Sequence, residues 1–480
     1  MASEIRVNTF KNRSGLGTVS INDTGASFSG VVTATSGFSG DLTGNSIVVG
    51  DKFINSSGVG IGTTDTTGRN AGVGTAIGTL IYNTTVNTVQ TWIGSQWANL
   101  YDPVKLNSIT GSLLVGTETT LTLTGTNFGP VGNITVNFSG GSLNENITGQ
   151  ITVENTTGIV TTTSAVFDAV SSGDNITIRF TNSEGLESSS QSITAKTPPV
   201  GGATTTTYES GGTNYRSHTF TTSGSFVVSP TYPVTVDYLI VAGGGGGGNA
   251  NGGGGGAGAG GFRTATGVSL TGATYPVTVG TGGAGAGANT SGRGSNGNDS
   301  VFNSVTSIGG GGGGGEPPSS TAPGNPGGSG GGSGRNSGTA GTGTSGQGNP
   351  GGTGNGNEGG GGGGATNAGS DGTNSNIGGP GGDGATNAFA NGSNVTYAGG
   401  GGGGTENGTP TNFGVGGPGG GGNGGAQNDS ATGPVVAATN GTDGLGGGGG
   451  GSADNLSNVG TFKAGDGGDG VVVIRYPISN

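Results

Sequence analysis

The 480-residue sequence has few of the residues on which most protein chemistry depends. It contains no cysteine, one histidine, one methionine and two tryptophans, and only 8 % of its residues are charged. The absence of cysteine excludes disulfide bonds and thiolate metal sites. The single histidine, His218, falls in a predicted hairpin without an evident partner, so we expect a structural role for it. A net charge of −12 leaves the chain without the basic face that nucleic-acid binding requires.

Long apolar runs and enzyme motifs are also missing. No stretch has the length of a membrane span, and residues 1–7 lack the apolar core of a signal peptide. No glycine run continues into the lysine and hydroxyl residue of a phosphate-binding loop. The Gly-Asp segments 381–384 and 465–470 are similar to calcium-binding turns but lack the nonapeptide period, which favours plain turns. We therefore expect a protein that is not an enzyme, has no cofactor or metal, is assembled in a cytoplasm and does not insert into a membrane.

Glycine is what the sequence has in excess, with 123 residues, far above the usual share of about 7 %. Most of it lies in the C-terminal half, where glycine runs alternate with segments rich in Asn, Thr and Ser. Two apolar segments, 234–241 and 471–476, bracket this region and indicate buried strands. The runs themselves are residues 243–248, 252–256, 309–315, 359–364, 399–404, 419–422 and 446–451.

Two interpretations fit these runs. Gly/Ser stretches are normally flexible linkers, but a linker has no reason to begin and end in buried strands. The alternative is a bundle of extended, three-fold polyglycine II helices, which have no internal hydrogen bonds and can bond to one another through the backbone on every side. Because ordering glycine is entropically costly, many runs must pack together. We predict such a polyglycine II helix bundle for residues 243–480.

The N-terminal part is predicted to contain only small β elements. Residues 1–50 hold strands too short to bury much alone, which favours an attachment segment that pairs with other chains, most simply in a homotrimer. Residues 51–102 form a second segment with a hairpin whose strands are residues 78–83 and 89–97. The second of these strands would carry both tryptophans, as an anchor against neighbouring copies or as a carbohydrate platform.

A regular alternation of apolar and polar residues begins at residue 103. Residues 103–198 contain apolar and polar residues in turn, at a spacing near ten residues between strands, which predicts a β-sandwich. Two prolines and two glycines at 198–202 mark a domain boundary. Residues 199–242 are predicted to form the strands that lead into the glycine-rich domain.

Several of these segments resemble known families. The motifs GVGIGT at 58–63 and LIYN with VQTWIGSQW, at 80–97, are similar to segments of phage tail-fibre and baseplate-associated proteins, including those of phages that infect marine cyanobacteria. The motif GTNFG at 125–129 resembles the IPT/TIG immunoglobulin-like family. Residues 215–477 resemble the glycine-rich domain found at the ends of phage fibres, which implies stacked polyglycine II helices whose distal loops touch the host surface. The expected fold class is therefore all-β plus polyglycine II, with short N-terminal strands, an Ig-like β-sandwich and a C-terminal helix bundle bracketed by strands.

Recognition through loops is the chemistry that remains. Aromatic residues beside Asn, Ser and Thr suit a polar glycan or an outer-membrane protein, although they could equally cap the glycine layers against water. The candidate receptor-binding residues are Phe389, Asn391, Asn394, Tyr397 and Phe413.

The expected function is that of a phage virion fibre or adhesin. Its N-terminus would bind other virion proteins of the tail, baseplate or neck, and its glycine-rich domain would face the host. Two alternatives stay open. The first is a purely structural head, neck or baseplate decoration protein, and the second is an ice-binding or cell-surface matrix protein built on polyglycine II.

Overall fold

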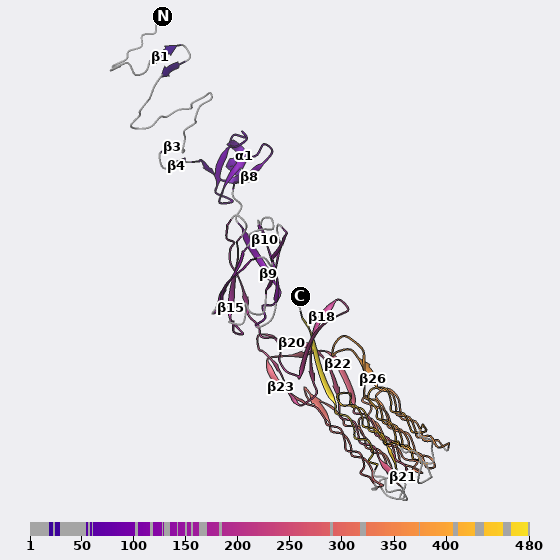
Figure 1. Ribbon diagram of the computed structural model, residues 1–480. Coiled ribbons are helices and arrows are strands. Elements are labelled where there is room, and N and C mark those ends of the chain that lie inside the picture. Colours follow the sequence, from indigo (N-terminus) through magenta and orange to yellow (C-terminus); the bar gives the residue numbers. More distant parts are fainter. Residues whose placement is uncertain are drawn as a thin grey trace. The chain divides into compact units, whose positions relative to one another are not determined.

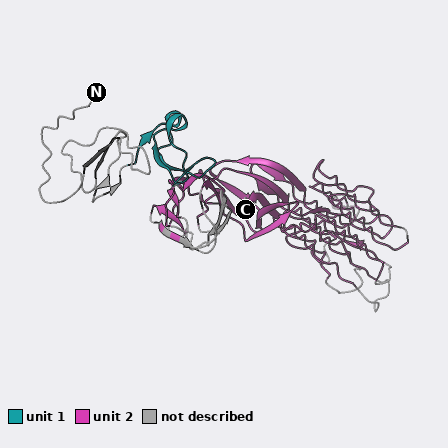
Figure 2. Cartoon of the chain, turned by 90° about the horizontal axis from the view of Figure 1, so that it is seen from above, with its two compact units in different colours: residues 1–103 teal, residues 104–480 magenta. Residues whose placement is uncertain are grey.

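The structure is a computed structural model that divides the chain into two compact units, residues 1–103 and 104–480 (Figure 2). Most of the first sixty residues, including most of the predicted attachment segment, lie outside the described residues. The described residues are 19–22, 25–28, 54–55, 58–59, 61–100, 104–115, 119–126, 128, 135–141, 143–148, 151–154, 157–162, 170–181, 185–288, 291–316, 323–373, 375–406, 411–427, 436–454 and 462–478.

The first unit contains small strand pairs and one short helix. Strands β1 and β2 form one antiparallel pair, and β3 and β4 form another. Residues 61–100 form a sheet of order β5-β6-β7-β8 beside helix α1, whose first turn is capped by the carboxylate of Asp65. The elements are β1 (Val19–Asn22), β2 (Gly25–Phe28), β3 (Ile54–Asn55), β4 (Gly58–Val59), β5 (Thr63–Thr64), α1 (Thr66–Gly72), β6 (Leu80–Asn83), β7 (Thr88–Trp92) and β8 (Trp97–Asn99).

The hairpin predicted in this unit is confirmed, but its second strand is shorter than predicted. Trp92 ends β7 and Trp97 begins β8, and the two residues pair across the strands. Gly94 lies between them with a φ of 99°, a conformation that glycine adopts readily and that turns the chain. The two rings therefore meet edge to face, with centroids 5.6 Å apart, instead of lying along one strand.

Residues 104–198 form two four-stranded antiparallel sheets around one apolar core, as the alternating pattern predicted. The sheet orders are β13-β14-β10-β9 and β12-β11-β15-β16. In β15 the buried residues Ile176, Ile178 and Phe180 alternate with more exposed ones, and Phe180 stacks on Phe128. The strands are β9 (Lys105–Thr110), β10 (Thr119–Thr126), β11 (Thr135–Gly140), β12 (Leu143–Thr148), β13 (Ile151–Glu154), β14 (Thr157–Thr162), β15 (Asn175–Thr181) and β16 (Gln191–Thr194).

Two further sheets follow and share a second core. The five-stranded sheet has the order β17-β18-β29-β20-β22, and the four-stranded sheet has the order β19-β23-β24-β25 (Figure 1). The two strands predicted to bracket the glycine region are confirmed, and they pair with each other as β20 and β29. The strands are β17 (Thr204–Ser210), β18 (Thr213–Phe220), β19 (Gly224–Val228), β20 (Val234–Val241), β22 (Phe262–Leu270), β23 (Ala273–Thr278), β24 (Ser300–Phe302), β25 (Val305–Ser307) and β29 (Val471–Ile478).

The glycine runs between β20 and β29 are extended segments joined by backbone hydrogen bonds. In the first run, every third amide donates to the same neighbouring segment, so one run bonds to three neighbours in turn. The prediction that the runs bond to one another through the backbone is thus confirmed. The donor and acceptor pairs are Gly243–Asn298, Gly246–Ser295, Gly244–Gly468, Gly247–Gly465, Gly245–Gly258 and Gly248–Gly255, at 2.8 to 3.1 Å.

The helix bundle predicted for residues 243–480 is not supported. The described residues of this region include short strands and extended segments but no helix. The amides of the runs donate to neighbouring segments and not to carbonyls of their own run, so none of the described segments is a helix closed by its own hydrogen bonds. The short strands here are β21 (Asn249–Gly253), β26 (Ala385–Asn387), β27 (Val395–Tyr397) and β28 (Ser452–Asp454).

The fold class is nearly all-β, with several small sheets. Apart from α1, the described residues form strands, turns and extended segments. Within that part of the chain, no helix has the length and apolar character needed to cross a membrane.

Candidate functional site

The glycine segments together form a body, called the glycine body, with two ends that differ in structure. The sheet end is the end at which the segments join β20 and β29. The loop end is the opposite one, where β21 and β28 pair (Figure 1). Each segment crosses this body once, so successive inserts alternate between the two ends.

Four of the five candidate receptor residues lie at the sheet end. They belong to the β26–β27 hairpin, which contacts the five-stranded sheet. Ser217 of β18 donates from its hydroxyl to the carbonyl of Ala390 at 2.6 Å, and the Tyr208 hydroxyl donates to the carbonyl of Phe389 at 2.7 Å. Tyr397 of the hairpin packs with Leu239 of β20 in one buried apolar cluster, which holds the hairpin against the sheet. The hairpin is therefore part of the packing between the glycine segments and the sheet.

The side chains of this hairpin divide into buried and exposed ones. Tyr397 is only 4 % exposed, and burial raises the pKa of its hydroxyl. Phe389 is partly buried, with its ring 4.0 Å from the guanidinium carbon of Arg475. Asn391 and Asn394 are exposed. Of the four candidates in this hairpin, the two asparagines are thus the exposed ones, and both aromatic rings pack within the fold.

Arg475 organises the sheet side of this contact. Its guanidinium carbon lies over two aromatic rings, 4.2 Å from the ring centroid of Tyr215 and 4.0 Å from that of Phe389. It donates to the Asp237 carboxylate at 3.0 Å and to the Tyr208 hydroxyl at 3.3 Å. Burial opposes the charge, but these two hydrogen bonds outweigh it and raise the pKa of Arg475. Such a cation, paired and stacked, is a structural element.

The fifth candidate, Phe413, lies at the loop end and is partly buried. Its neighbour Gly414 donates to Gly403, and the next residue, Gly404, donates to Gly254 beside β21. The structure therefore separates Phe413 from the other four candidates and does not bring the five together in one site.

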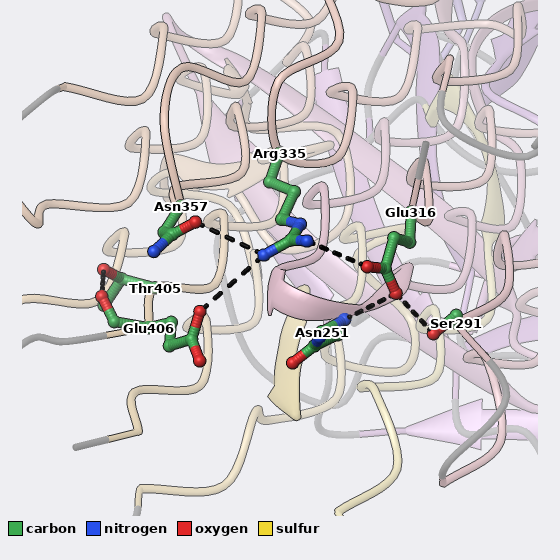
Figure 3. Close-up of polar contacts among 7 residues, drawn as sticks. All are labelled: Asn251, Ser291, Glu316, Arg335, Asn357, Thr405 and Glu406. Carbon is green, nitrogen blue, oxygen red and sulfur yellow. Dashed lines mark hydrogen bonds and ion pairs between the residues drawn. The ribbon is translucent and has the colours of Figure 1, made fainter. Parts of the chain in front are cut away.

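A charged network occupies the loop end (Figure 3). Arg335 donates to Glu316 at 3.0 Å and to Asn357 at 3.3 Å, and it lies 3.8 Å from the carboxylate of Glu406. These side chains are mostly buried, at 23 % exposed for Arg335, 17 % for Glu316 and 12 % for Glu406. One cation between two carboxylates leaves the local group with a net negative charge, and it ties together loops that are far apart in the sequence.

Glu316 extends the network to two further loops. Its second carboxylate oxygen accepts from the backbone amide of Asn251 at 3.2 Å and from the hydroxyl of Ser291 at 2.7 Å. Since Asn251 belongs to β21, the network fixes loops to the strand pair at this end. The arrangement can hold a loop surface in one shape.

Glu358 lies beside this network and is nearly fully buried, at 2 % exposed. Its backbone pairs with Thr405, the residue before Glu406. Burial raises the pKa of its carboxyl group to about 7, and the charge of Glu406 adds to this rise. One of its oxygens, Oε2, has no hydrogen-bond partner among the described residues. A carboxyl group that takes up a proton near neutral pH therefore lies at the loop end.

Acidic and amide side chains along the edges of the glycine body have a role that the sequence did not reveal. They accept hydrogen bonds from outward-facing backbone amides and are spaced by three residues, which matches the repeat of the glycine segments. The Gly-Asp segment 465–470, interpreted as plain turns, is one such extended edge. The contacts are Asp466 with Gly285 at 2.7 Å, Asp469 with Gly282 at 2.8 Å, Asn296 with Gly312 at 3.0 Å and Asp299 with Gly309 at 2.8 Å.

The single histidine of the chain is buried. His218 is 2 % exposed, with Nδ1 2.8 Å from the carbonyl of Gly201 and Nε2 3.5 Å from the Tyr476 hydroxyl. Burial lowers the pKa of this imidazole, and the contact with Gly201 only partly opposes that effect. Across the described residues, no group of three His, Cys, Asp or Glu side chains is placed to hold a metal ion.

Comparison with known proteins bears on the C-terminal part. The model of the glycine-rich domain family matches residues 220–477, which are 258 of the 480 residues. No curated protein matches the sequence. The matched region covers β19, β20, all the glycine segments and most of β29. Because this match extends over more than half of the chain, the protein belongs to the glycine-rich domain family.

Proposed function

We propose that this chain is a phage virion fibre or adhesin-type protein whose glycine-rich domain is displayed for attachment to a host surface. Its N-terminal part would bind other virion proteins, and its loop end would meet a glycan or an outer-membrane protein. In this proposal the chain is not an enzyme and becomes part of a virion assembled in the host cytoplasm.

The observation that carries the proposal is the construction of the loop end. Glycine segments joined by backbone hydrogen bonds form a body without bulky side chains, and the loops leave this body at an end remote from the paired strands β20 and β29. The ion pairs of Arg335 connect several of these loops. A surface of loops fixed on a rigid support suits recognition, because little conformational entropy is lost when a ligand binds. The similarity of residues 58–63 and 80–97 to phage fibre segments favours a virion.

Adsorption competition tests this proposal. Purified full-length protein is added to host cells before the phage that carries it, and free phage is counted over time. We expect the protein to slow adsorption in a dose-dependent manner. If it has no effect at saturating concentration while it remains folded, the attachment role is wrong and a purely structural decoration role replaces it.

Variants at the two ends of the glycine body locate the binding surface. Phe413→Ala changes the loop end, and the double variant Asn391→Ala with Asn394→Ala changes the exposed part of the sheet-end hairpin. We expect Phe413→Ala to weaken competition several-fold and the double variant to compete like the wild type. The reverse result would move the receptor site to the sheet end.

A further inference from the structure

The sheet of residues 61–100 carries apolar side chains on both faces. Helix α1 lies over the face that carries Asn83 and Gln90, and the strand register places Ile81, Trp92 and Trp97 on that same face. Gln90 accepts from Arg69 of the helix at 2.6 Å and from Asn83 at 2.8 Å, and it donates to Asn99 at 2.8 Å. Gln90 and Asn83 are both buried, at 5 % and 0 % exposed. A second apolar face is unusual, because a sheet with one covered face normally places polar residues on the other.

The opposite face, here called the open face, is mainly apolar as well. Strand register puts Leu80, Thr91 and Ala98 in one row across the sheet, and the hydrogen bond from Leu100 to Val89 continues the pairing into a second row. Leu80 is 40 % exposed and Leu100 is 60 % exposed. The open face consists of Leu80, Tyr82, Val89, Thr91, Ala98 and Leu100, none of which is charged.

These forty residues lack a core of their own. Ile81 is the one buried apolar side chain among residues 61–100, and α1 has no buried residue. Five of the nine large apolar side chains that are exposed in the described part of the chain belong to this segment, namely Ile77, Leu80, Val86, Ile93 and Leu100. A segment of about forty residues without disulfides or metal usually needs an oligomeric partner to be stable. Its apolar area is therefore available for a protein contact.

The distribution of charge along the chain favours a second copy of this chain as the partner of the open face. Residues 61–100 contain one acidic and one basic residue, Asp65 and Arg69, so the whole net charge of −12 lies elsewhere in the chain. A neutral apolar face matches the same face of another copy, and the neutral segment is where copies of an acidic chain can meet with the least repulsion.

We propose that the open face is a self-association surface that joins copies of this chain. The acidic remainder of each copy opposes this contact over a distance, and salt screens that repulsion. Association should therefore strengthen as ionic strength rises. The inference concerns how copies join and does not rest on the attachment role of the loop end.

Sedimentation of the full-length chain across the micromolar range tests the surface, and the chain offers matched controls. Leu80→Asp and Leu100→Asp place a charge in the open face. Ile377→Asp and Val415→Asp place it at positions of similar exposure in the glycine domain, 42 % and 58 %. We expect an oligomeric wild type, a dissociation constant raised at least about tenfold by either open-face variant, and no change in the two controls. A monomeric wild type, or open-face variants that associate like the wild type, would overturn the proposal.

Cross-linking gives a second readout that does not depend on weakening the fold. Because the chain has no cysteine, Leu80→Cys carries a single thiol. We expect mild oxidation to join copies through Cys at this position, and Ile377→Cys to remain uncross-linked. If both variants cross-link equally and slowly, contact at the open face is random and the proposal fails. A full-length Leu80→Cys chain that forms no cross-link under conditions in which the wild type is oligomeric would also overturn the proposal.

Discussion

Arg475 and Asp237 lie directly opposite each other where β29 pairs with β20, and their side chains form an ion pair at 3.0 Å. The two residues are 238 positions apart in the sequence. Between them the chain leaves the sheet, forms the whole glycine body and returns. Their side chains are only 13 % and 17 % exposed, so the pair fixes the point at which the glycine body is closed.

Removing one partner of this pair should destabilise the fold. Asp237→Ala leaves a mostly buried guanidinium without its carboxylate, and we expect a loss of about 2 to 3 kcal/mol in the free energy of unfolding. Arg179 and Glu187, 3.5 Å apart and more than half exposed, provide the control. Glu187→Ala should cost about 0.5 kcal/mol or less. Equal effects of the two variants in denaturant unfolding would show that the buried pair does not close the domain.

The close approach of the glycine segments predicts a strong dependence on position. A Cβ at Gly256 would lie 2.1 Å from the carbonyl oxygen of Gly401, whereas a Cβ at Gly338 would meet nothing within 4 Å. Gly256→Ala must push two backbones apart, so we expect a loss of about 3 kcal/mol or more. Gly338→Ala should change stability by about 0.5 kcal/mol or less. Thermal unfolding of both variants checks this, and a fully tolerated Gly256→Ala would refute the packing described here.

Glu358 predicts that stability falls as pH rises. Its pKa in the folded chain, about 7, is above the ordinary value of 4.5, so the native state binds this proton more tightly than the unfolded chain. The contribution is complete below about pH 4.5 and is lost as the pH approaches 7. Glu358→Gln should remove this part of the pH dependence and raise the melting temperature at pH 8 relative to the wild type. Glu209→Gln, at an exposed position, controls for the loss of one charge. Parallel melting curves for wild type and Glu358→Gln from pH 4 to 8 would contradict the assignment.

The sequence was most informative where apolar residues alternate. The predicted strand at 175–180 corresponds to β15, and the segments 234–241 and 471–476 correspond to β20 and most of β29. Alternation reports directly which side of a strand is buried. The predicted strand at 165–167 lies outside the described residues. The strand predicted through both tryptophans was too long because the turn conformation of Gly94 leaves no trace in the apolar pattern.

The loops of the glycine domain could not be placed from composition. The insert around Asn391 and the insert around Phe413 are both rich in polar residues, yet one lies at the sheet end and the other at the loop end. The order of the inserts along the chain was the available signal. Because each run crosses the body once, successive inserts must lie at opposite ends. The spacing of Asp466 and Asp469 was a second signal, since three residues is the repeat of the hydrogen bonds between segments.

Cryo-electron microscopy of the intact particle tests the central proposal most directly, with this chain located in the density. The account predicts that residues 1–100 contact the tail, baseplate or neck and that the loop end of the glycine body faces away from the particle. A glycine body packed against capsid or collar subunits, with its loop end covered, would contradict the attachment role.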